Sequence, residues 1–185
     1  MGQKIAILYG LNEGPGMGKK LRLSLEKAGY SMTSDPRRAD IIFAHSGGCF
    51  LIPTDNHASL VMLVGLPYWP HRPWFIATVV KVWREFKAYK NRHHMRQWLR
   101  KWAYHVLYAF RLPSAVRMGL NMSPSNTWNS LQPQVIVRNH QEAYCNPSVA
   151  GVAFRGPRTF ISLPGEHDDC WDNPEPYIGI IKSLS

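Results

Sequence analysis

The sequence predicts an α/β fold in which a mainly parallel sheet is flanked by helices on both faces. Short apolar runs recur along the chain, and segments with helical patterns or turn residues separate them. This alternation is typical of parallel strands, because parallel neighbours need a crossover connection between them. The chain has 185 residues, of which 45% are hydrophobic. That length is enough for one domain with a buried core and short for two.

Six segments have the apolar or β-branched composition of strands. They are residues 4–9, 30–33, 40–44, 60–64, 134–137 and 159–163. Helices are expected at residues 17–28 and 176–184, with a brief one between Ser46 and Pro53. The sequence GLPYWPHRP after the fourth expected strand contains three prolines, which exclude regular structure there.

Residues 74–111 interrupt the alternation with a basic, aromatic and helical segment, which we call the basic insertion. Two helices fit it, and in the second the apolar residues recur at steps of three and four, as in an amphipathic helix. The chain has a formal net charge of +10, and nine Lys and Arg residues against one Glu fall at 81–111. We predict that the insertion is a lid on a single domain that spans residues 1–185.

The sequence also bears on location and redox state. No stretch of eighteen uncharged apolar residues occurs, and the first residues enter the expected strand without the apolar segment of a signal peptide. The three cysteines, Cys49, Cys145 and Cys170, are scattered and form no CxxC pair. This argues against a disulfide framework and against structural zinc. We therefore expect a cytoplasmic protein with reduced thiols.

Three loops after expected strands carry the residue types of nucleophilic catalysis. Ser46 follows the third expected strand and is followed two residues later by Gly48, the small neighbour that a tight strand-to-helix turn requires. Glu142 follows the fifth strand and His167 the sixth. Parallel strands place their carboxyl ends at one edge of the sheet. The order serine, acid, histidine is the one expected for a catalytic triad on such a sheet.

Four motifs carry a resemblance to a known family. In chain order they are ILYGLNEGPG, IIFAHSGGCF, VIVRNHQEAYCNP and FISLPGEHDDCW. With them the chain resembles a small α/β-hydrolase-fold protein, similar to the compact serine-hydrolase family that includes the retinoblastoma-binding hydrolase. The corresponding segments of that family are the oxyanion loop, the nucleophile elbow, the acid loop and the histidine loop. They lie in the first and last thirds of the chain, and the basic insertion takes the place of a lid.

The resemblance implies a role for each motif. Ser46 is implied as the nucleophile, His167 as the general base, and Glu142 as the acid that orients the histidine. The backbone N–H groups of Leu11 and Gly47 are implied as the oxyanion hole. No cofactor is expected for this chemistry.

Two alternatives to the acid adjoin the histidine in the chain. Asp168 and Asp169 could also supply a carboxylate, but residues next to His167 are poorly placed to meet its ring from behind, so we prefer Glu142. His45, in the elbow itself, is expected to pack or hydrogen-bond near the turn rather than to catalyse.

These patterns predict a serine hydrolase that cleaves an ester, thioester or amide through an acyl-enzyme at Ser46. Four tryptophans of the basic insertion suggest a pocket for an apolar acyl group: Trp74, Trp83, Trp98 and Trp102. The alternative is a non-catalytic binding protein on the same fold, whose residues 81–111 dock a partner or an anionic membrane. Nucleic acid is a weaker candidate partner, because no recognised nucleic-acid module accompanies the basic and aromatic residues.

Two other candidate sites fail on spacing. The glycine-rich loop at 10–18 lacks the phosphate-loop pattern, since Glu13 stands where its first glycine belongs and Lys20 where its Ser or Thr belongs. The residues of the sequence HDDC at 167–170 are consecutive, so their side chains diverge. We therefore expect neither a phosphate loop nor a metal site.

Overall fold

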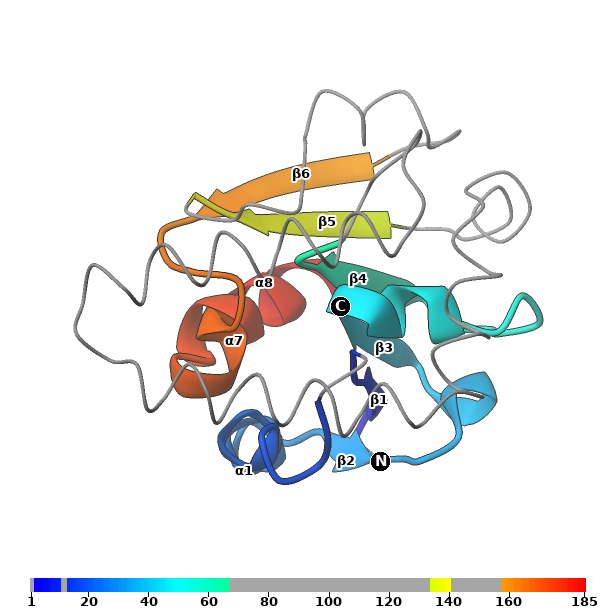
Figure 1. Cartoon of the computed structure of the whole chain (residues 1–185). Coiled ribbons are helices and arrows are strands. Elements are labelled where there is room, and N and C mark those ends of the chain that lie inside the picture. The colour runs from blue at the N-terminus through cyan, green and yellow to red at the C-terminus, as the bar shows by residue number, and fades with distance from the viewer. Residues whose placement is uncertain (1, 11–12, 67–133, 141–157) are drawn as a thin grey trace, which may run out of the picture.

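The described residues of the protein form a six-stranded sheet in which all neighbouring strands are parallel (Figure 1). The computed structural model describes residues 2–10, 13–66, 134–140 and 158–185. Its strands are β1 Lys4–Leu8, β2 Ser31–Met32, β3 Ile41–His45, β4 Leu60–Val64, β5 Gln134–Asn139 and β6 Arg158–Leu163. They lie in the order β2-β1-β3-β4-β5-β6. The predicted fold class is therefore confirmed.

In the described part of the chain, helices follow the strands β1, β2, β3 and β6. The α-helices are α1 Lys19–Lys27, α7 Asp169–Asp172 and α8 Glu175–Leu184, and the 3-10 helices are η1 Pro36–Arg38 and η2 Ser46–Leu51. None of the helices in the described parts of the chain is long and apolar enough to cross a bilayer. The basic insertion, with its four tryptophans, lies outside the described residues, in the connection between β4 and β5.

The sheet separates two apolar cores, because alternate side chains of each strand point to opposite faces. On one face Ile41, Phe43 and Met62 pack with residues of α1, α7 and α8, the three helices that Figure 1 shows together on one side. On the other face Ile42 and Leu63 pack with residues of η2 and the loop after it. All residues of β3 and β4 are buried, so the central strands form a rigid base for the loops at their ends.

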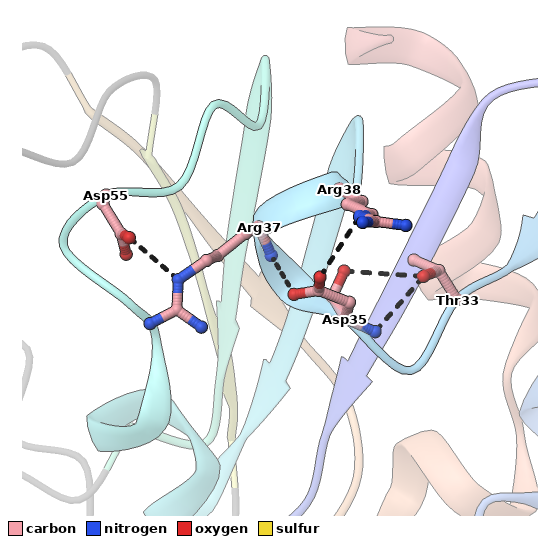
Figure 2. A network of polar contacts seen from close by, with 5 residues as sticks. All are labelled: Thr33, Asp35, Arg37, Arg38 and Asp55. Carbon is pink, nitrogen blue, oxygen red and sulfur yellow. Dashed lines mark hydrogen bonds and ion pairs between the residues drawn. The ribbon is translucent and has the colours of Figure 1, made fainter.

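The connection from β2 to β3 is a compact turn (Figure 2). Thr33 Oγ1 accepts a hydrogen bond from the Asp35 N–H at 3.2 Å. The Asp35 side chain caps η1 by accepting from the Arg37 N–H at 3.0 Å. The Arg37 guanidinium in turn pairs with Asp55, with Nε and Oδ2 2.8 Å apart. These contacts lead the chain directly from a two-residue edge strand into the central strand β3.

Candidate active site

Ser46 is the first residue of η2, directly after the buried strand β3. Its backbone φ angle is +51°, in the left-handed region, and within the described residues no other non-glycine residue has a positive φ. That conformation is strained for a residue with a Cβ, and such strain concentrates at functional sites. A serine in a strained strand-to-helix turn presents its hydroxyl at the carboxyl edge of the sheet.

Gly48 allows η2 to pass across the end of β1. A Cβ built on Gly48 would lie 2.6 Å from the carbonyl carbon of Leu8 and 2.9 Å from that of Tyr9. Both neighbours are backbone atoms of the sheet, so neither can move aside without disturbing β1. The second residue after the serine is therefore glycine because of packing, as the elbow pattern predicts.

The loop after β1 lies against Ser46. A Cβ on Gly10 would lie 3.0 Å from the Cβ of Ser46, so the two backbones approach closely. The Gly10 N–H donates to Oε2 of Glu13 at 2.7 Å, which folds the loop back on itself. Of the two expected oxyanion donors, Gly47 follows Ser46 in η2, and Leu11 lies outside the described residues.

His45 is completely buried, with 0% exposure, and both of its ring nitrogens face oxygen atoms. Nδ1 lies 2.6 Å from Oε1 of Glu13, and Nε2 lies 2.8 Å from the backbone carbonyl oxygen of His167. A carbonyl oxygen only accepts, so Nε2 must carry a proton.

The surroundings of His45 favour its charged form. Burial alone would lower the pKa of His45, but its contacts with Cys170 and Glu13 outweigh burial and hold the pKa well above the ordinary 6.5. Burial raises the pKa of the Cys170 thiol above its ordinary 9.0, so the thiol is neutral at physiological pH. Glu13 is the carboxylate bonded to the ring, and Asp168 places a second carboxylate oxygen within 4.8 Å of a ring nitrogen, so these charges favour an imidazolium that donates on both sides.

His167 lies in the loop between β6 and α7, and its ring contacts that of His45 with the centroids 4.7 Å apart. The end of β5 holds this loop, since the Asn139 amide donates to the carbonyl of Glu166. The Tyr177 hydroxyl of α8 donates to the other atom of that amide, Oδ1, at 2.9 Å. Strand β5 and helix α8 therefore fix the backbone just before the histidine.

The structure brings the loops of Ser46 and His167 to one edge of the sheet, where His45, next to Ser46 in the chain, contacts His167. Glu142 lies outside the described residues. Asp168 places a carboxylate oxygen within 4.8 Å of a ring nitrogen of His167, whereas the Asp169 carboxyl lies against Gly165. Asp168 and Asp169 therefore stay open as alternatives to the expected acid.

Four side chains gather one ligand-type atom each within 4.8 Å: Glu13, His45, His167 and Asp168. Such groups hold divalent cations when imidazole nitrogens are free to coordinate. Here both nitrogens of His45 have oxygen partners, and Nε2, which donates to a carbonyl oxygen, has no lone pair for a metal. We therefore interpret the cluster as a hydrogen-bonded group and assign no metal site to it.

Glu13 belongs to this site although the sequence pattern does not predict it, because in the sequence Glu13 stands out only as the residue that breaks the phosphate-loop spacing. A useful signal was available, because a histidine at the end of a fully buried strand needs a polar partner. An acidic residue in a glycine-rich loop beside that strand is such a partner.

Comparisons with known proteins bear on the fold. A thioesterase domain from the curacin biosynthetic pathway matches with a TM-score of 0.62 and 12% identity, over 97% of this chain and 91% of that one. A candidate epoxide hydrolase from Klebsiella pneumoniae subsp. pneumoniae matches with a TM-score of 0.62 and 12% identity, over 99% and 90%. An α/β-hydrolase enzyme from the sediment metagenome of the Mar Chica lagoon, Morocco, matches with a TM-score of 0.58 and 12% identity, over 99% and 90%.

No family model and no curated protein matches the chain. The resemblance to the retinoblastoma-binding hydrolase family therefore stays a prediction. The structural matches extend over nearly the whole of this chain and of the solved chains. Together with the parallel sheet and the strained serine after a central strand, they show that the chain has an α/β-hydrolase-like fold.

Proposed function

We propose that the protein is a serine hydrolase that cleaves an ester, thioester or amide through an acyl-enzyme at Ser46. The observation that carries the proposal is the left-handed conformation of Ser46 between β3 and η2, which Gly48 makes possible by packing on β1. A serine held in this way presents its hydroxyl at the carboxyl edge of the sheet, where it can attack a bound substrate. His167, on the neighbouring loop, is the proposed base.

The proposed reaction has two steps. The Ser46 oxygen bonds to the carbonyl carbon of the substrate while its proton passes to His167, which then protonates the leaving group as the bond to it breaks. Water attacks the acyl-enzyme with the same histidine as base and releases the acid. The proposed oxyanion donors are the N–H groups of Leu11 and Gly47, and each is expected to lower the barrier by about 3 kcal/mol.

The proposed substrate carries an apolar acyl group. This rests on the four tryptophans of the basic insertion, since aromatic side chains are typical of the lining of apolar pockets. The chemistry needs no cofactor, because the serine and histidine themselves supply nucleophile and base.

Replacement of Ser46 by Ala should abolish labelling by a fluorophosphonate probe, because the probe's phosphorus bonds to the activated serine oxygen as fluoride leaves. Labelling is measured by intact-mass spectrometry of the wild type and of Ser46→Ala. The control is Ser59→Ala, which removes an exposed hydroxyl bonded to the Asp40 carbonyl and should label like the wild type.

Labelling that is absent from the wild type, or that survives in Ser46→Ala, contradicts the hydrolase proposal. Absence in the wild type would favour the non-catalytic alternative, in which residues 81–111 dock a partner or an anionic membrane.

Replacement of Glu142 by Gln should slow labelling by about 100-fold or more, because the histidine then loses the group that orients it and stabilises its charged form. The second-order rate constant of fluorophosphonate labelling measures the effect. Asp168→Asn and Asp169→Asn are the matched changes and should stay within about threefold of the wild type. A larger loss in Asp168→Asn would assign the acid to that residue instead.

A further inference from the structure

We propose that His45 and Glu13 form a positioning pair that holds the loop after β1 and the loop after β6 against the nucleophile Ser46. The inference rests on the proposed function, because it concerns the geometry that acylation of Ser46 requires. Neither residue reacts with substrate in the proposed mechanism. The pair acts through the backbone of Gly10 and His167, which it contacts directly.

The first link joins the elbow to the loop after β1. One oxygen of the Glu13 carboxylate accepts from the Gly10 N–H at 2.7 Å, and the other accepts from Nδ1–H of His45 at 2.6 Å. The Glu13 side chain is only 7% exposed, so water competes little for these bonds. Gly10 directly precedes Leu11, and the carboxylate therefore fixes the chain next to a proposed oxyanion donor.

The second link joins the elbow to the histidine loop. Nε2–H of His45 donates to the backbone carbonyl of His167 at 2.8 Å, and the two imidazole rings are in contact. His45 directly precedes Ser46 in the chain. One ring thus sets the separation between the nucleophile and the residue proposed as its base, a distance to which catalysis is sensitive at the scale of about 1 Å.

With Glu13 as a carboxylate, both links require the charged ring. A neutral imidazole has a single N–H and cannot donate to Glu13 and to the His167 carbonyl together. The titratable groups near the ring come from three elements: Glu13 from the loop after β1, Cys170 from α7, and His167 and Asp168 from the loop after β6. On β4 the residue in register with His45 is the apolar Val64. Glu13 is therefore the counter-charge bonded to the ring, and its removal leaves the buried cation with only the Asp168 carboxylate, within 4.8 Å, to compensate it.

The decisive variant is Glu13→Gln, which keeps the size of the side chain and removes its charge. Its imidazole nitrogens are compared with those of the wild type by NMR at about pH 7.5, and the His45 signals are assigned by their loss in His45→Gln. The wild type should show two N–H protons on His45, and Glu13→Gln should show one. Glu26→Gln, an exposed change on α1, is the matched control and should keep both.

Fluorophosphonate labelling gives the functional reading. In Glu13→Gln the maximal rate of labelling should fall by about 10- to 100-fold, while the probe concentration at half-maximal rate changes by less than about threefold, because positioning affects reaction more than binding. The alkaline limb of the rate profile should also move to lower pH, since the ring loses its proton more readily. Glu13→Asp restores the charge and should recover part of the rate.

Unchanged imidazole protons and an unchanged labelling rate in Glu13→Gln overturn the proposal. If neither Glu13 variant unfolds cooperatively, neither is folded, and the NMR spectrum of the wild type then tests the proposal. One N–H proton on the His45 ring contradicts the proposal, and two support it. If the wild type does not label at all, the proposed function fails separately. The pair is then judged by the His167 amide signal, which should shift in Glu13→Gln and stay fixed in Glu26→Gln.

Discussion

Small residues at two positions allow the loops of the candidate site to approach one another. Gly10 lies where a side chain would meet Ser46, and Gly48 lies where one would meet the backbone of Leu8. The need for glycine at position 48, two residues after the serine, could be predicted, because a strained turn needs small neighbours. The close approach of Gly10 to Ser46 could not, because it depends on how β1 and β3 pair.

Replacement of Gly48 by Ala should destabilise the protein by about 1–3 kcal/mol, because the added methyl group meets backbone atoms of β1 that cannot move aside. It should also slow fluorophosphonate labelling, since the turn that carries Ser46 must shift. Urea unfolding and the labelling rate measure the two effects. Gly14→Ala is the matched control, because a Cβ there meets nothing within 4 Å. Equal stability of the two variants would contradict this account of the elbow.

The sequence predicts the positions of some candidate site residues and not the contacts of others. Ser46 and His167 were placed at the ends of strands, because apolar runs locate strands and parallel strands end at one edge. The partnership of Glu13 and His45 joins residues 32 apart in the chain. Which way the Glu13 side chain points depends on the path of the glycine-rich loop, and no periodic pattern encodes that path.

Among the secondary-structure elements, the strands were predicted best. All six lie where apolar runs stand, and β5 extends to Asn139 beyond the expected end because its last residues pair with β6. Helix α7 was not predicted, since its four residues are too few to show a period. In α1, Leu21 and Leu25 are buried while Leu23 is 42% exposed, so the helical step of four decides which leucines enter the core.

At the scale of the whole molecule, the buried ring of His45 makes the free energy of unfolding depend on pH. The pKa of His45 is raised on folding, so between the unfolded value near 6.5 and the folded value the native state binds more protons than the unfolded state. The contribution of His45 is therefore complete below about pH 6.5 and is lost as the pH rises through the folded pKa.

The free energy of unfolding of the wild type should accordingly fall as the pH rises from about 6.5 to about 8, by at most about 1.4 kcal/mol per pH unit. Urea unfolding at several pH values measures the slope, and His45→Gln should lack this component. The window ends near pH 8 because the raised pKa of Cys170 adds a loss of the same sign at higher pH. A wild-type slope that is flat, or identical to that of His45→Gln, would contradict the assignment of a charged ring.

The contact of His45 with the His167 carbonyl also bears on when the protein becomes reactive during its synthesis. The two residues are 122 positions apart in the chain, and domains assemble as the ribosome delivers their segments in order. The elbow with Ser46 emerges early, whereas His167 arrives only after β6, the outermost strand on its side of the sheet. A nascent chain therefore carries the serine without its proposed base, and on the proposed mechanism it stays chemically silent until β6 joins the sheet.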